Sequence, residues 1–193
     1  MNIILIGPPG TGKGTMAKLI ESDFGLKHIS AGDLLREEVK AGTALGKKAE
    51  PIMKAGKLVD DSLVAQIISS NVPRFAKKGF VLDGFPRNQQ QAKILEEIFK
   101  KTKIGIDLIL LIETSDKEIV NRLGSRRQCP KCHTIYGSNI PPKIEGKCDS
   151  DGTALVLRDD DRPDVVKKRL KLYHDSAKGL LDFYSKKNTI KKV

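Results

Sequence analysis

A glycine-rich loop directly after a short apolar run constrains the fold more than any other part of this sequence. Residues 3–6 (Ile-Ile-Leu-Ile) are continuously apolar, as in a strand covered on both faces, and residues 7–15 read Gly-Pro-Pro-Gly-Thr-Gly-Lys-Gly-Thr. A helix is predicted over 13–24. This order of strand, loop and helix is the context of a phosphate-binding loop (P-loop), in which backbone N–H groups and the helix N-terminus surround phosphate oxygens. A glycine-rich turn that holds a lysine by chance does not account for that context.

The rest of the chain continues the alternation of strand and helix. Further strands are predicted at 28–29, 80–82, 108–112 and 190–193, and helices at 31–41, 62–76, 89–100 and 117–123. Such alternation predicts a parallel sheet with right-handed crossovers, hence a doubly wound α/β fold.

A last amphipathic helix is predicted from Val166 onward. Its apolar residues Val166, Leu170 and Tyr173 lie three or four positions apart, and the pattern continues to Tyr184. Asp161 is expected to be its N-cap.

Length and charge narrow the class of protein. The chain has 193 residues, enough for one core domain with small insertions, and a formal net charge of +11. This charge suits a polyanionic partner, either nucleotide phosphates or nucleic acid. No apolar stretch reaches the roughly 20 residues of a membrane span, and no signal peptide is evident at the start. We therefore expect a cytoplasmic protein that does not associate with membranes.

The three cysteines form part of a candidate metal site. Cys129 and Cys132 form one Cys-x-x-Cys pair, and Cys148 and Asp151 have the same spacing. They lie within residues 128–157, which lack helical periodicity and are read as a small β-rich insertion. Thiolates and a carboxylate can hold a structural Zn²⁺, since four protein donors leave no open position. Two alternatives are three unliganded thiols, and His133 as the fourth ligand.

The P-loop and the motifs after it resemble those of one enzyme family. In the usual P-loop a serine or threonine directly follows the lysine, whereas here Gly14 separates Lys13 from Thr15. This form resembles the adenylate kinase branch of the nucleoside monophosphate kinases. The motifs that follow in that family's order are Ser-Ala-Gly-Asp-Leu-Leu-Arg (30–36), Gly-Lys-Leu-Val (56–59) and Asp-Gly-Phe-Pro-Arg (83–87). The resemblance covers essentially the whole chain.

The resemblance implies a division into three parts and a reaction. A core P-loop domain (1–29, 60–124 and 162–193) would carry a nucleoside monophosphate (NMP)-binding insertion (30–59) and a zinc-stapled lid (125–161). The implied activity is reversible phosphoryl transfer from ATP to AMP, giving two ADP, by direct in-line attack of the AMP phosphate. Closure of both insertions over the reactants, an established property of adenylate kinases, would exclude water. We expect a monomer that uses Mg²⁺ with ATP and binds no nucleic acid.

Site residues follow from the same resemblance, position by position. The implied ATP-binding residues are Gly10, Thr11, Gly12, Lys13, Gly14, Thr15, Arg122, Arg126, Ile135 and Tyr136. The implied AMP-binding residues are Ala31, Arg36, Lys57, Leu58, Val59, Gly84, Phe85, Pro86, Arg87, Gln91, Arg158 and Arg169. The implied catalytic residues are Lys13, Asp83, Arg87, Arg126, Arg158 and Arg169.

Arginines suit this reaction because transition-state charge spreads over the phosphoryl oxygens, which guanidinium groups bind in pairs. His28, His133 and His174 are expected to be structural or surface residues, because a phosphate monoester needs no general base.

Three departures from the family pattern keep alternatives open. Ala31 and Asn88 resemble residues of uridylate/cytidylate kinases, so a pyrimidine or broad-specificity monophosphate kinase is the alternative, whereas Gln91 and the long lid favour AMP. The sequence also ends after its last strand, which implies either a truncated sequence or a weaker contact with the ATP adenine. A nucleic-acid-binding zinc-ribbon ATPase is a third possibility. The few aromatics (three Tyr, six Phe, no Trp) argue against it.

Overall fold

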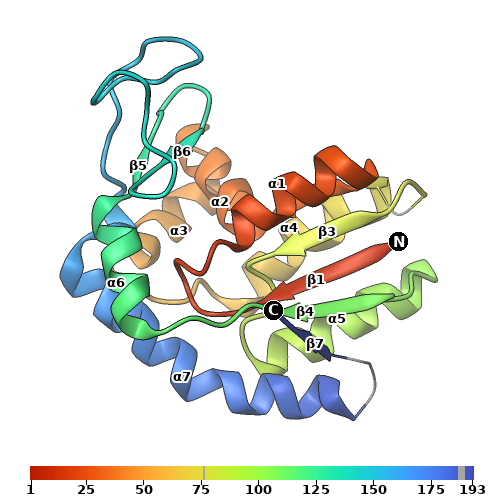
Figure 1. Ribbon diagram of the computed structural model, residues 1–193. Helices are drawn as coiled ribbons and strands as arrows, with labels where there is room; N and C mark the ends of the chain where they lie inside the picture. Colours follow the sequence, from red (N-terminus) through yellow and green to blue (C-terminus); the bar gives the residue numbers. More distant parts are fainter. Residues whose placement is uncertain (76, 187–189) are drawn as a thin grey trace.

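A five-stranded parallel sheet forms the centre of the computed structural model, which describes residues 1–193 apart from 76 and 187–189 (Figure 1). The strands lie in the order β2-β3-β1-β4-β7, and each pairs in parallel with its neighbours. Their bounds are β1 (Asn2–Ile6), β2 (Lys27–Ser30), β3 (Phe80–Asp83), β4 (Leu108–Leu111) and β7 (Ile190–Lys192). The predicted doubly wound α/β fold is confirmed.

Helices cover both faces of the sheet. The side chains of β1 alternate between two cores: Ile3 and Leu5 pack with Ala17 of α1, whereas Ile4 and Ile6 belong to the larger core on the other face. Figure 1 shows α1 on one face and α5 and α7 on the other. These helices and their neighbours are α1 (Lys13–Phe24), α4 (Asp61–Phe75), α5 (Gln89–Thr102), α6 (Asp116–Ser125) and α7 (Pro163–Ser185).

Two segments extend from this core. Helices α2 (Ala31–Lys40) and α3 (Ala44–Lys54) pack against each other between β2 and α4. The second segment follows α6 and contains the antiparallel pair β5 (Arg127–Gln128) and β6 (Ile135–Tyr136). Further bridges join Gln128 to Val156 and Lys147 to Ala154, so this segment is β-rich as predicted. In Figure 1 it projects away from the sheet, at the upper left.

Two details of the sequence prediction need correction. Helix α3 was not predicted, although its cap, Thr43, accepts a hydrogen bond from the N–H of Gly46. Asp161 was expected to cap α7, but the N-cap is Arg162 with Pro163 as the first helical residue, and Asp161 ends a 3₁₀ turn (Asp159–Asp161) with its side chain buried.

Most other helix limits agree within two residues, and Ala76, the predicted end of one helix, lies outside the described residues. Among the described helices, none combines the length and the apolar character needed to cross a bilayer.

Candidate active site

A cleft of about 730 Å³ opens at the carboxyl ends of β1, β2 and β3, where Ile6, Ser30 and Asp83 line it. Ligands bind at this edge in parallel α/β sheets. Nearly all residues implied to bind ATP or AMP line the same cleft. The exceptions are Thr11, whose hydroxyl donates to the carbonyl of Pro8, and Phe85, which is fully buried in the larger core.

The loop between β1 and α1 holds Lys13 in place. The ammonium group of Lys13 donates to the carbonyls of Gly7 and Pro8, at 2.8 and 2.7 Å. Gly10 adopts φ +82°, and a Cβ there would lie 2.8 Å from Cγ of Leu123, so a larger residue would not fit. Burial lowers the pKa of Lys13 to about 8, with Arg87 and other arginines adding to the effect and Asp83 opposing it. The ammonium therefore sits where a polyphosphate would relieve an unfavourable positive potential.

Asp83 lies at the end of β3, facing the start of α1. Its Oδ2 would be 3.5 Å from a Cβ at Gly14, an ordinary van der Waals distance that places the carboxylate beside the first turn of α1. Nε2 of His28 lies 3.7 Å from the same oxygen. Burial alone would raise the pKa of Asp83, but His28 and Lys13 hold it below its usual value. A carboxylate that lines the cleft next to the P-loop lysine is a suitable partner for hydrated Mg²⁺.

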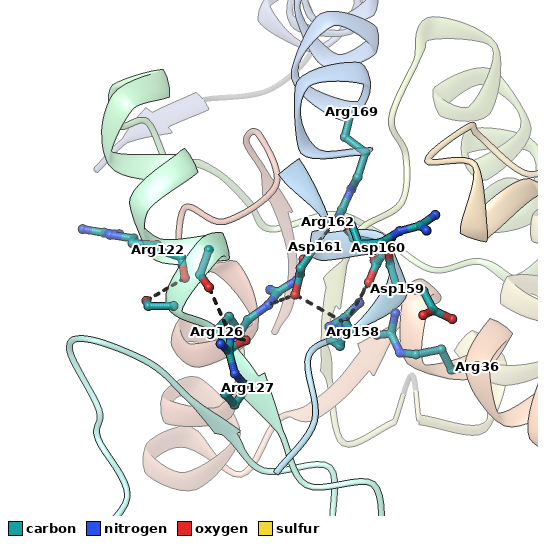
Figure 2. A network of polar contacts seen from close by, with 12 residues as sticks. Arg36, Arg122, Arg126, Arg127, Arg158, Asp159, Asp160, Asp161, Arg162 and Arg169 are labelled. Carbon is teal, nitrogen blue, oxygen red and sulfur yellow. Dashed lines mark hydrogen bonds and ion pairs between the residues drawn. The ribbon is translucent and has the colours of Figure 1, made fainter. Parts of the chain in front are cut away.

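Arginines from three elements converge on two adjacent carboxylates (Figure 2). Arg126, at the end of α6, binds Asp161 with its Nε 2.6 Å from Oδ2. Arg158 pairs with Asp160 at 2.9 Å, and Arg169 of α7 reaches both carboxylates at 3.2 and 3.3 Å. Asp160 and Asp161 thus hold these guanidinium groups on one side of the cleft.

Mutual repulsion and burial shape the electrostatics of this cluster. Burial lowers the pKa of Arg169 to about 10, an effect that Asp160 opposes and that Arg87 and Arg126 increase. Burial alone would raise the pKa of Asp160, but Arg158 and Arg169 hold it well below its usual range. The cluster is therefore an anion site with excess positive charge that is only partly neutralised from within.

One side of the cleft lies between α2, residues 53–59 and the start of α5. Arg36 lines the cleft and forms an ion pair with Asp33. Nε of Arg87 donates to the carbonyl of Gly84, in a turn that contains the cis peptide bond Phe85–Pro86. Gln91 also lines the cleft although its side chain is almost fully buried. Ala31 and the segment Lys57–Val59 complete this side.

The other side of the cleft includes the projecting segment. Arg122 of α6 binds Glu118 at 2.6 Å and lies 3.4 Å from the carbonyl of Thr11. Ile135 and Tyr136 of β6 line the cleft above it. The hydroxyl of Tyr136 accepts a hydrogen bond from the N–H of Asp149 at 2.8 Å and lies 3.4 Å from Sγ of Cys148. Tyr136 therefore joins the cleft wall to the cysteine cluster behind it.

The candidate metal ligands are assembled within the projecting segment. One ligand atom from each of Cys129, Cys132, Cys148 and Asp151 lies within 4.8 Å of the others. The thiols of Cys132 and Cys148 are 3.4 Å apart, and Cys129 Sγ is 3.5 Å from Asp151 Oδ2. Ligand atoms about 2.3 Å from a tetrahedral Zn²⁺ are about 3.8 Å apart, so the cluster is compatible with a zinc site.

Four residues of the site were not assigned to it from sequence. Asp160 and His28 line the cleft, Asp161 orders the arginines, and Asp61 binds Gln91. His28 and Asp61 lie in no local motif that marks them. For Asp160 and Asp161 the available signal was the run Arg-Asp-Asp-Asp at 158–161.

The sheet, the lysine-bearing loop and the arginine cluster define a P-loop nucleotide-binding protein of the phosphotransferase class. The family model for adenylate kinase matches residues 5–189. An adenylate kinase of Agathobacter rectalis is 44% identical over 195 residues, covering 100% of this chain and 91% of that protein. One of Methanothrix thermoacetophila is 46% identical, covering 100% and 90%. The chain belongs to the adenylate kinase family.

Proposed function

We propose that this protein catalyses reversible transfer of the terminal phosphoryl group of ATP to AMP, giving two molecules of ADP. The observation that carries the proposal is one cleft that is lined by Lys13 of the P-loop, by Gln91 and by the arginine cluster. Two nucleotides bound end to end would bring their phosphates together at Arg126, Arg158 and Arg169.

The proposed reaction is a direct displacement. An oxygen of the AMP phosphate attacks the terminal phosphorus of ATP while the bond from that phosphorus to the β-phosphate oxygen breaks. No general base is required, since a phosphate monoester with a second pKa of about 6 is mostly dianionic at pH 7. The chain's part is to position the two phosphates and to stabilise the spread negative charge.

Each positive group has a proposed place in this arrangement. Lys13 contacts the β- and γ-phosphates, and Arg36 and Arg87 bind the AMP phosphate. Arg126, Arg158 and Arg169 contact the transferring group. The phosphates would therefore neutralise the positive charge that Asp160 and Asp161 leave uncompensated. The remaining ATP and AMP residues named from sequence, including Ile135, Tyr136 and Lys57–Val59, form the walls around the two nucleosides.

The two metals have separate proposed roles. Mg²⁺ bound with ATP would be held near Asp83 and Thr15, and it would reduce the negative charge on the phosphates. Zn²⁺ would be held by Cys129, Cys132, Cys148 and Asp151, where four protein donors make its role structural. We further propose that residues 30–59 and 125–161 are the two parts that close over the reactants.

The test is phosphate transfer from ATP to AMP, CMP, UMP or GMP, each followed by ADP production. We expect AMP to be the preferred acceptor. Preference for CMP or UMP would instead identify a pyrimidine monophosphate kinase, the alternative that the comparisons do not favour. ATP hydrolysis that nucleic acid stimulates, with no transfer to any monophosphate, would overturn the class of reaction.

A further inference from the structure

The side-chain amide of Gln91 is held in one orientation by two partners. Its Oε1 accepts a hydrogen bond from the backbone N–H of Arg87 at 2.7 Å. Its Nε2 donates to Oδ1 of Asp61, also at 2.7 Å. Asp61 is the first residue of α4, thirty positions away in the sequence, and it does not line the cleft.

Neither partner can accept a reversed amide. A backbone N–H can only donate and an ionised carboxylate can only accept, so turning the amide by 180° would break both hydrogen bonds. Gln91 is 2% exposed, and unpaired polar atoms at such depth are costly. The two partners therefore fix which end of the amide is the donor.

Asn88 strengthens this arrangement without facing the cleft. Its Oδ1 accepts from the N–H of Gln91 at 2.7 Å and caps α5, while its Nδ2 lies 3.3 Å from Oδ1 of Asp61. Both the oxygen and the nitrogen of the Asn88 amide therefore have partners within the fold. Asn88 is one of the two residues that resemble those of uridylate/cytidylate kinases, and in this fold it contacts both Asp61 and Gln91.

A fixed amide distinguishes amino from oxo bases. Among the described contacts, Gln91 retains one N–H and one oxygen lone pair for a ligand. Adenine offers an exocyclic N–H₂ donor beside a ring-nitrogen acceptor, which an amide in one orientation can match. Hypoxanthine offers the reverse, a carbonyl acceptor beside a ring N–H donor. Cytosine has the adenine-like order and uracil the reverse, so this contact rejects IMP and UMP more strongly than CMP.

We propose that Asp61 is a positioning residue that sets acceptor-base specificity, by holding the Gln91 amide in the orientation that reads a 6-amino purine. This proposal rests on the proposed transfer to AMP. It goes beyond it by assigning the discrimination against oxo bases to a carboxylate that touches no substrate.

The test compares AMP and IMP, which differ at the purine 6-position, as acceptors for the Asp61→Asn variant. Asparagine keeps the size but can present either a donor or an acceptor to Gln91. We expect the ratio of kcat/KM for AMP to that for IMP to fall about tenfold. The variant loses one of the two partners that oppose the reversed Gln91 amide, and a buried hydrogen bond contributes about this factor. A loss of helix stability alone would lower kcat/KM for AMP and for IMP by the same factor and leave their ratio unchanged.

Asp60→Asn is the matched control. Asp60 is the neighbouring exposed carboxylate, and it binds Ser62 rather than Gln91. It should leave the AMP-to-IMP ratio unchanged. In a Gln91→Ala background, Asp61→Asn should have no further effect on the ratio. Asp61→Ser serves as a second variant if the asparagine protein is too unstable to purify.

The outcomes separate this proposal from the proposed function. A wild type that transfers to AMP and prefers it to IMP, with the same ratio in Asp61→Asn and Asp61→Ser, would overturn the role of Asp61 only. A wild type with equal use of AMP and IMP would also overturn it. A wild type that transfers phosphate to neither would overturn both proposals.

Discussion

Arg126 and Asp161 form a two-point ion pair in which the aspartate side chain is completely buried. The same carboxylate lies 3.3 Å from Arg169 and 4.0 Å from Arg158. One buried aspartate therefore partly offsets the charge of guanidinium groups from three parts of the chain. Without it, those groups would repel one another in a partly buried site.

Asp161→Asn should destabilise the ligand-free protein by about 3 kcal/mol, because it leaves buried guanidinium groups without their counter-charge. ATP should raise the unfolding temperature of this variant by more than it raises that of the wild type, because the phosphates replace the missing negative charge. Thermal unfolding with and without ATP measures both effects. Asp159→Asn, an exposed neighbour, is the control and should change little. Equal unfolding temperatures for the two variants would contradict the role given to Asp161.

Arg169→Lys should lower kcat by about 100-fold with little change in KM. A lysine keeps the positive charge but cannot bind two phosphoryl oxygens in a fixed plane. Steady-state kinetics with both substrates provide the measurement. Arg162→Lys is the matched control, because Arg162 is exposed at the start of α7 and its side chain donates to the carbonyl of Asp159 at 3.3 Å, away from Asp160 and Asp161. If both variants kept wild-type kcat, Arg169 would have no place in the chemical step.

ATP affinity should fall as the pH rises above 8. Burial lowers the pKa of Lys13 to about 8, so the ligand-free protein loses this positive charge between pH 7 and 9.5. Bound phosphates favour the charged form, so binding at pH 9.5 must be accompanied by proton uptake and should be about tenfold weaker. Titration calorimetry at the two pH values, in buffers of different ionisation enthalpy, measures affinity and proton uptake. A Lys13→Arg variant stays charged and should lose the dependence, whereas an unchanged wild-type affinity would argue against the lowered pKa.

The purified protein should hold about one zinc ion per chain. Cys148→Ser should lose that metal and lower the unfolding temperature, because the ion ties together two turns of a segment with little core of its own. His133→Ala should retain it, since His133 is not part of the assembled ligand set. Metal analysis of the three proteins decides the matter. Zinc retained in Cys148→Ser but lost in His133→Ala would reassign the ligands.

Much of this fold could be predicted from short patterns. The apolar run at β1, the P-loop and the alternation of strands and helices lie within consecutive residues, so the sequence shows them directly. Helix α3 could not be predicted in the same way. It contains Gly46 and Pro51, both unfavourable inside helices, and its formation depends on packing against α2.

The site was predictable where residues belong to motifs and not where they meet through the fold. Lys13, Arg87 and the cysteine pairs lie in recognisable segments. Asp161 has the residue type of a helix cap, and only the folded chain places it among Arg126, Arg158 and Arg169. Asp61 likewise contacts Gln91 across thirty positions. Such long-range polar contacts have no periodicity that a single sequence could show.

We propose that ATP and AMP occupy one cleft end to end, with their phosphates meeting at the arginine cluster. A bisubstrate analogue that joins two adenosines through five phosphates tests it most directly, by calorimetry and by inhibition kinetics. We expect one molecule to bind per chain, more tightly than either nucleotide, and to compete with both ATP and AMP. Competition with only one of them, or no binding, would contradict it.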